Sequence, residues 1–235
     1  MIQFYAPDIE NTHSLSVEES VHCVRVLRKR AGDVIHVSDG RGTRYECRIL
    51  EADTRGVKLE IISRTEVAKN WDCRIILAVA PTKNADRMAW LVEKATEIGV
   101  DTIWFVSCRH SERKNINTDR LRRNAISAMN QSLKTRLPEI SEVTFRELIE
   151  TDAEGRFFGY CDEKTERVEF VNEYVPCSDV VIAIGPEGDF SEEEVGSLRQ
   201  VGFKAVTLGK ERLRTETAAL YSVTAVHVIN NMLNR

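Results

Sequence analysis

Several short motifs that mark common α/β enzymes are missing from this 235-residue sequence. It has no G-x-G-x-x-G turn after its first α/β strand and no G-x-x-x-x-G-K-[ST] loop, which excludes the usual dinucleotide and nucleoside-triphosphate sites. It also has no G-x-S-x-G elbow and no H-E-x-x-H helix. The chemistry of the protein therefore has to be sought outside these families.

The cysteines and histidines show no metal-binding pattern. No C-x-x-C pair is present, and no histidine stands at zinc spacing from a cysteine, so we expect no metal. Several of the six cysteines lie in strand-like apolar stretches, where a reduced thiol packs as a small apolar group. They predict a reducing compartment, the cytoplasm (Cys23, Cys47, Cys73, Cys108, Cys161 and Cys177).

Long hydrophobic runs are also missing. No apolar stretch approaches the roughly 18–20 residues that cross a bilayer. The first residues, MIQFYAPDIEN, lack the basic and then apolar segments of an export signal. We therefore expect neither membrane insertion nor export.

Charge is unevenly placed along the chain, whose formal net charge is −4. Eight Lys or Arg residues lie between Arg109 and Arg136, against only Glu112 and Asp119. The net charge argues against bulk attraction to nucleic acid, but a local basic face can hold a phosphate backbone. A solvated helix surface is the more common explanation of any single run of charge.

The first third of the sequence predicts a small antiparallel β unit, which we interpret as a barrel. Ser16 and Glu19 form an S-x-x-E capping box before a short helix. Residues 33–39, 43–50 and 56–63 then have strand character, with a glycine turn at 40–42. The polar stretch 64–70 is interpreted as a linker, so the predicted domains are 1–69 and 70–235.

The rest of the chain alternates apolar strands with amphipathic helices and predicts an α/β domain. Thr144 with Glu147 and Ser191 with Glu194 are further capping boxes. The predicted strands are 74–80, 102–107, 156–161, 179–184 and 203–208. One predicted helix carries Met88, Leu91, Val92, Ala95 and Ile98 on one face and stops at Gly99. The other main helices run from about Asp119 to Leu133, from the cap at Ser191 to a stop at Gly202, and from Thr215 to about Leu233.

Two glycine-containing loops follow predicted buried strands, IGPEGDF at 184–190 and LGKERLRTETA at 208–218. Parallel strands present ligand sites at their carboxyl ends. Gly185, Gly188 and Gly209 let the backbone turn and approach a ligand closely. Either loop alone is compatible with a structural turn, but together they predict a small-molecule pocket.

The combination of motifs along the chain resembles the RsmE family. The motifs are H-x-x-x-V-L-R from His22, K-x-x-D-R-M-x-W-x-V-x-K-A-T-E-[IL]-G-V from Lys83, S-E-R at 111–113, Q-S-x-x-x-x-x-P-x-I from Gln131, G-P-E-G and L-R-T-E-T-A. The family consists of SPOUT-class methyltransferases that act on N3 of a uridine in 16S ribosomal RNA. The resemblance implies a PUA-like RNA-binding barrel and an α/β domain with a C-terminal trefoil knot. It also implies S-adenosylmethionine as cofactor, the small ribosomal subunit as partner, and a homodimer.

Site residues follow from the matched motifs. The resemblance assigns cofactor binding to Val79, Ala80, Ile184, Gly185, Pro186, Glu187, Gly188, Leu208, Gly209, Arg212, Leu213, Thr217 and Ala218. The predicted RNA-binding residues are His22, Arg25, Arg28, Arg113, Arg122, Arg123 and Gln131. The sequence departs from the family pattern at three positions: Asp189 stands where the family often has glycine, Asn130 where it often has glutamate, and Glu211 where it often has arginine. The last departure displaces the arginine by one position, to Arg212.

Methyl transfer to N3 of uridine requires positioning and loss of the imide proton. Arg214 is the candidate for stabilising negative charge on uracil O2 or O4. Glu187 and Glu216 are candidates for the base, and Glu187 is the second predicted catalytic residue. A carboxylate in either place can equally cap backbone N–H groups, and water or RNA can also take the proton.

Three alternatives are left open by the sequence. A SPOUT enzyme of this kind can act on transfer RNA or on a ribose 2′-hydroxyl. A protein with a degenerate pocket binds RNA without catalysis, although the intact glycines and LRTETA argue against this. A nucleotide-dependent ligase is disfavoured by the missing phosphate loops.

Overall fold

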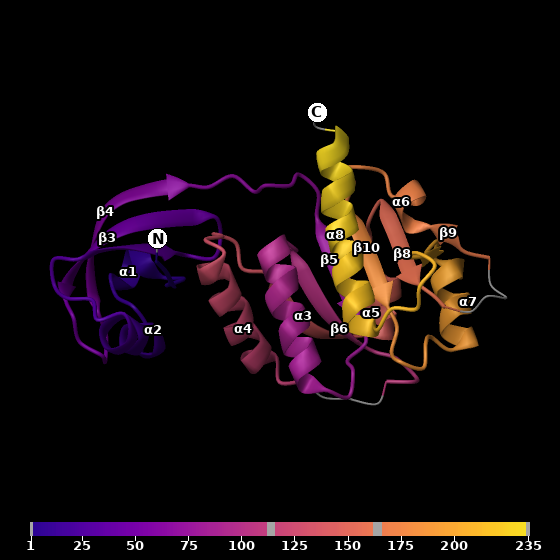
Figure 1. Cartoon of the computed structure of the whole chain (residues 1–235), viewed down its shortest axis with the longest axis horizontal. Coiled ribbons are helices and arrows are strands. Elements are labelled where there is room, and N and C mark those ends of the chain that lie inside the picture. Colours follow the sequence, from indigo (N-terminus) through magenta and orange to yellow (C-terminus); the bar gives the residue numbers. More distant parts are fainter. Residues whose placement is uncertain (1, 112–115, 162–165, 234–235) are drawn as a thin grey trace. The chain divides into compact units, whose positions relative to one another are not determined.

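The computed structural model describes residues 2–111, 116–161 and 166–233 of the chain (Figure 1). The protein divides into two compact units. Unit 1 comprises Met1–Asn70 together with Ile126–Leu137, and unit 2 comprises Trp71–Ala125 and Pro138–Arg235. Among the described helices, none is both long and apolar enough to span a bilayer.

Unit 1 contains a four-stranded sheet in the order β1-β2-β3-β4. Strand β1 pairs with β2 in parallel, and the β2–β3 and β3–β4 pairs are antiparallel. The sheet is therefore mixed, whereas the sequence predicted antiparallel pairing alone. Its elements are β1 (Gln3–Tyr5), α1 (Ile9–Thr12), α2 (Val17–Val21), a π-helical turn (His22–Val26), β2 (Val34–Ser38), β3 (Thr43–Glu51) and β4 (Lys58–Glu66).

One face of this sheet carries the core of unit 1. Alternate residues of β2 and β3, such as Ile35, Val37, Tyr45 and Cys47, are buried, as the period of a half-buried strand requires. They join one cluster with residues of the first fifteen positions, among them Phe4. Strand β4 continues to Glu66, so the predicted linker at 64–70 begins inside a strand.

The predicted capping box at the start of α2 is only half formed. The Ser16 hydroxyl accepts from the Glu19 backbone N–H, as expected. The Glu19 carboxylate does not return to Ser16: its Oε1 accepts from the backbone N–H of Tyr5 at 3.3 Å and from Nδ2 of Asn130 at 3.1 Å. Burial raises the pKa of Glu19 to about 7, against the lowering effect of these two hydrogen bonds.

The chain segment Ile126–Leu137 contributes further contacts inside unit 1. Nε2 of Gln3 donates to the carbonyl of Lys134, and the Arg44 guanidinium donates to the carbonyl of Leu133. The Gly42 N–H donates to the carbonyl of Thr135. Local sequence patterns do not report such pairings, since the partners lie about 90 or more residues apart.

Unit 2 is an α/β domain around a seven-stranded parallel sheet in the order β7-β6-β5-β10-β8-β11-β9. Its strands are β5 (Ile75–Val79), β6 (Thr102–Ser107), β7 (Glu139–Thr144), β8 (Gly155–Gly159), β9 (Val168–Glu169), β10 (Val180–Ile184) and β11 (Lys204–Thr207). Its helices are α3 (Ala85–Ile98), α4 (Thr118–Gln131, whose last part belongs to unit 1), α5 (Phe145–Ile149), α6 (Phe170–Glu173), α7 (Glu192–Gln200) and α8 (Thr215–Leu233). Every strand predicted in this part is confirmed, while β7, β9 and α6 were not predicted.

Helix ends in unit 2 follow the local signals. The capping boxes at Thr144 and Ser191 are both complete. Helix α3 stops at Gly99, whose φ of 122° suits glycine. Helices α3 and α8 lie side by side against the sheet (Figure 1).

Candidate active site at the carboxyl ends of the sheet

A cavity of about 990 Å³ lies in unit 2 beyond the carboxyl ends of β8, β10 and β11. Its wall consists of the segments that follow these strands, 159–161, 184–190 and 206–216, with Arg87, Arg167, Glu169 and Ala218. Strand β10 pairs with both β5 and β8, so the loop after β10 leaves the sheet from an interior strand. The two glycine-containing loops therefore meet at one cavity, as predicted for parallel strands.

The first loop turns at Pro186, where the Asp189 N–H donates to the Pro186 carbonyl. Asp189 has a φ of 62°, the left-handed region that glycine adopts without cost and that Asp tolerates better than most residues. Its carboxylate accepts from the backbone N–H of Cys161 and from that of Phe190. These contacts account for Asp189 at a position where the family pattern often has glycine.

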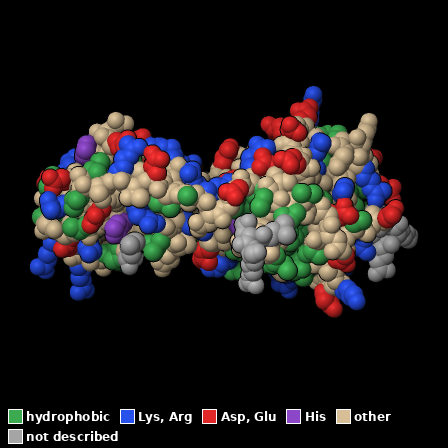
Figure 2. All heavy atoms as spheres, turned by 90° about the horizontal axis from the view of Figure 1, so that it is seen from above, with side chains coloured by type: hydrophobic (Ala, Val, Ile, Leu, Met, Phe, Trp, Pro, Cys, Tyr) green, Lys and Arg blue, Asp and Glu red, His purple; other side chains and the backbone are tan. Residues whose placement is uncertain are grey.

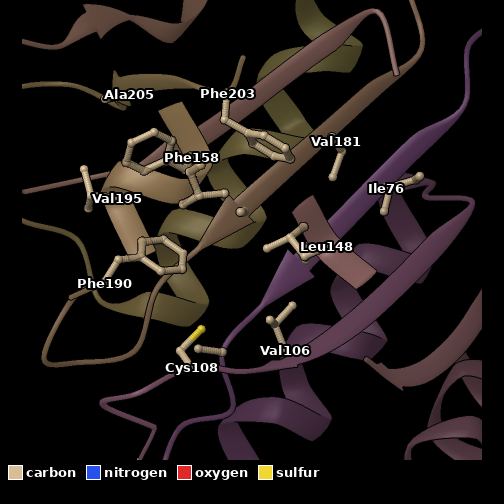
Figure 3. Close-up of a cluster of buried hydrophobic side chains, with 14 of the residues drawn as sticks. Ile76, Val106, Cys108, Leu148, Phe158, Val181, Phe190, Val195, Phe203 and Ala205 are labelled. Carbon is tan, nitrogen blue, oxygen red and sulfur yellow. The ribbon is translucent and has the colours of Figure 1, made fainter. Parts of the chain in front are cut away.

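Phe190 anchors the end of this loop in the core. Figure 3 shows its ring among side chains from the sheet and from α5 and α7, and it is 4% exposed. The ring packs edge-on against Phe158 with centroids 6.0 Å apart. A Cβ at Gly185 would lie 3.1 Å from the Phe190 ring, a tight contact, so glycine suits the point where the anchor meets the loop.

The second loop joins β11 to α8. Gly209 has a φ of 124°, and the Thr207 hydroxyl donates to its carbonyl at 2.8 Å. At the start of α8, the Thr215 hydroxyl donates to the Gly185 carbonyl at 3.3 Å. This hydrogen bond ties the second loop to the first across the cavity wall.

Charged side chains are concentrated on the same wall. Glu187, Arg212 and Arg214 are exposed, so they are accessible to a ligand. Glu216 differs, because its side chain is 9% exposed and its Oε1 lies 3.5 Å from Nε of Arg87. The cavity thus combines exposed guanidinium groups with one buried carboxylate.

Most of the residues assigned to the cofactor line this cavity. They are Ile184, Gly185, Pro186, Glu187, Gly188, Leu208, Gly209, Arg212, Leu213 and Ala218, together with the catalytic candidate Arg214. The structure does not bring three others to the wall. Val79 and Ala80 are fully buried at the end of β5, and Thr217 is exposed on α8 outside the lining.

The predicted RNA-binding residues are exposed wherever the structure describes them. These are His22, Arg25, Arg28, Arg122, Arg123 and Gln131, and Arg113 lies outside the described residues. His22 also packs edge-on against Phe4, which is a packing contact within unit 1. On the face drawn in Figure 2, basic and acidic side chains are interspersed.

Several lining residues were not assigned by sequence reasoning, among them Arg87, Tyr160, Cys161 and Arg167. Arg87 lies within the quoted K-x-x-D-R-M motif but received no role. Tyr160 and Cys161 follow β8, and the carboxyl end of that predicted strand was the available signal. In the described part of the chain, no group of three or more His, Cys, Asp or Glu is arranged to hold a metal ion.

A small β unit is followed by a parallel α/β domain with a glycine-loop cavity, and the family matches of both parts place the chain in the class of RNA methyltransferases. Residues 69–227 match the family described as RNA methyltransferase domain, and residues 15–62 match RNA methyltransferase PUA domain. A ribosomal RNA small subunit methyltransferase E from Mesomycoplasma hyopneumoniae is 30% identical over 95% of this chain and 98% of its own.

Solved structures of RNA methyltransferases match the fold of this chain. A probable rRNA-methyltransferase from Porphyromonas gingivalis has a TM-score of 0.94 at 41% identity, covering 99% of this chain and 100% of the other. A ribosomal RNA small subunit methyltransferase E from Neisseria gonorrhoeae, bound to S-adenosyl methionine, has a TM-score of 0.82 at 27% identity, covering 97% and 98%. The chain belongs to the ribosomal RNA small subunit methyltransferase E family, which confirms the resemblance read from its motifs.

Proposed function

We propose that the protein uses S-adenosylmethionine to methylate N3 of a uridine in the 16S ribosomal RNA of the small subunit. The observation that carries this proposal is the cavity formed jointly by the loops at 184–190 and 206–216. Family membership supports ribosomal RNA as the substrate. The choice of N3 rests on the motif resemblance.

The lining chemistry fits this cofactor. Ile184, Leu208 and Leu213 provide an apolar wall for a purine ring, and the glycines let backbone groups approach it. Guanidinium groups on the wall suit the methionine carboxylate. A volume of about 990 Å³ is at the upper end of small-molecule pockets, roughly 300–1,000 Å³, and accommodates a target base beside the cofactor. When bound, S-adenosylmethionine supplies a sulfonium methyl group as electrophile.

The protein has to hold the uracil and stabilise the charge that develops when N3 loses its proton. We assign the second task to Arg214, because its planar guanidinium offers paired donors to O2 or O4. Glu187 stands on the exposed side of the wall, where it can also contact the incoming nucleotide. The target base has to leave any stack to enter the cavity.

For RNA, we propose that His22, Arg25 and Arg28 of unit 1, and Arg122 and Arg123 of unit 2, bind the phosphate backbone. Their exposure and charge support this role, since backbone contacts position the RNA without reading its sequence. Gln131 is proposed as a polar RNA contact. We propose that the domain boundary lies at 69/70, with a PUA-like barrel before it and a trefoil knot in the domain that follows.

We also propose that two copies of the chain form a homodimer through α8. This helix exposes Tyr221, Val228 and Met232, the last at 70%, which is a large apolar area for a free helix face. Cytoplasmic location is proposed because all six cysteines lack disulfides.

Titration of S-adenosylmethionine by calorimetry, followed by radiolabelled methyl transfer to small-subunit particles and nucleoside analysis, tests the proposal. We expect binding, and label recovered as 3-methyluridine. Labelled ribose, labelled transfer RNA or an absence of binding would each contradict it and identify one of the alternative functions.

Two variants test the division of roles in the cavity. Gly188→Val is expected to abolish cofactor binding, because the added side chain blocks the approach of a ligand to the loop backbone and already at Cβ makes a tight 3.3 Å contact with the His110 side chain. Arg214→Ala is expected to leave the cofactor Kd within about threefold and to slow transfer by about 10²-fold or more. Loss of cofactor binding in the arginine variant would show that the assignment is wrong.

A further inference from the structure

Glu216 carries a buried oxygen without a protein partner. Its side chain is 9% exposed and lines the cavity. Oε1 faces the Arg87 guanidinium, whereas the buried Oε2 has no hydrogen-bond partner among the described residues. A buried acceptor left in this state destabilises the protein, and more so when it is charged. The arrangement therefore points to a donor that a ligand brings into the cavity.

Capping does not account for Glu216. A glutamate in the first turn of a helix often accepts from backbone N–H groups, as Glu194 does in the box at Ser191. For Glu216 the ion pair with Arg87 takes that place: the arginine comes from α3, balances the charge at Oε1 and leaves the buried Oε2 without a partner in a residue that lines the cavity. A carboxylate held in this way is a pure acceptor.

The uracil edge matches this wall. O2 and O4 are acceptors on either side of the N3–H donor, and the wall offers Arg214 as donor and Glu216 as acceptor, two residues apart in the chain. Glu187 provides no such match, because it is exposed and water competes for its oxygens. Cytosine has an unprotonated N3, so the same carboxylate disfavours it.

We propose that Glu216 is the catalytic residue that accepts the N3 proton and that Arg87 is the positioning residue that holds it; this rests on the proposed function. The proton moves from N3 to Oε2 as the N3–C bond forms and the methyl–sulfur bond breaks. The bonding pair of that bond stays on sulfur. The proton leaves for solvent with the product, which regenerates the carboxylate.

The test compares wild-type protein with Glu216→Gln, which preserves shape and removes the proton acceptor. The matched control is Glu192→Gln, an exposed glutamate in the first turn of α7 and outside the cavity. Each protein is measured for S-adenosylmethionine affinity by calorimetry, for thermal unfolding, and for single-turnover methylation of small-subunit particles from pH 6.5 to 9.5.

For Glu216→Gln we expect a cofactor Kd within about threefold of wild type and transfer that is about 10²–10⁴ times slower at pH 7. Its rate should rise about tenfold per pH unit, because only spontaneously ionised uridine reacts, while the wild-type rate changes little. 5-Fluorouridine in the RNA, with a more acidic N3–H, should rescue the variant more than wild type. Glu192→Gln should match wild type throughout.

For Arg87, the Lys variant should retain most activity and Arg87→Gln should lose it. The double variant Arg87→Gln/Glu216→Gln should be no slower than Glu216→Gln alone, since one residue acts through the other. If the two substitutions instead multiplied their separate losses of methyl-transfer rate, the positioning role of Arg87 would be refuted.

Two outcomes overturn the role of Glu216. One is a loss of cofactor affinity as large as the loss of rate, which makes Glu216 a cofactor ligand. The other is a pH profile parallel to that of wild type. Failure of the proposed function is separate, since wild-type protein itself would then yield no 3-methyluridine.

Discussion

The half-buried carboxylate of Glu19 makes the stability of unit 1 depend on pH. Burial raises its pKa to about 7 from an ordinary value of 4.5, so the folded state binds the proton more tightly than the unfolded state. Below pH 4.5 both states are protonated and the carboxyl costs nothing. Stability is then lost as pH rises from about 4.5 to 7, and the full cost remains above pH 7.

The perturbation is Glu19→Gln. A pKa change from 4.5 to about 7 corresponds to about 3 kcal/mol, which is the largest effect that ionisation of Glu19 can have on the free energy of unfolding. The amide oxygen of glutamine still accepts from Tyr5 and Asn130, but these hydrogen bonds lose the assistance of the charge. We compare the free energies of unfolding of the variant and of wild type at each pH. The difference in favour of the variant should be about 1–3 kcal/mol larger at pH 8 than at pH 4.5.

The free energy of unfolding should be measured in urea between pH 4.5 and 8.5. Hydrogen exchange at the amides of β3 reports the unit that contains Glu19 and separates it from unit 2. Glu18→Gln is the matched control, an exposed neighbour on the same helix, and should change stability by less than about 0.5 kcal/mol. An equal difference between Glu19→Gln and wild type at pH 5 and pH 8 would refute the reasoning.

Three further predictions concern the site loop, the RNA surface and the dimer. Asp189→Ala should lower the free energy of unfolding by about 1–3 kcal/mol, because alanine at φ 62° is strained and two hydrogen bonds are lost. Asp189→Gly should lower it less, because glycine adopts this φ without strain. Equal losses for the two variants in thermal melts would contradict the strain argument. Arg25→Ala should weaken RNA binding equally for all RNA sequences and reduce the slope of log K against log salt concentration by about 1. A loss of binding that depends on the RNA sequence in filter-binding assays would count against a phosphate contact. Val228→Asp, at an exposed α8 position, should give monomers in sedimentation while unit 2 stays folded, and an unchanged oligomeric state would exclude this face as the interface.

Local sequence signals determined most elements of unit 2, although not β7, β9 and α6, and the position of the cavity. Apolar runs such as 180–184 have few alternatives to a buried strand, and a capping residue such as Ser191 acts on backbone groups only three positions away. The glycines of the two loops were identifiable because conformational freedom belongs to the residue itself. Parallel strands then bring loops from different parts of the chain to one edge.

Only the tertiary structure decided which carboxylate of the cavity wall is buried and what holds it. Glu187 and Glu216 are equivalent by sequence, yet one is exposed and the other is buried against Arg87, 129 positions earlier in the chain. In unit 1, Glu19 satisfies the capping pattern but bonds instead to Tyr5 and Asn130. A motif determines which backbone groups lie within reach of a side chain. The burial of that side chain and its distant partners depend instead on packing between segments that are far apart in the sequence.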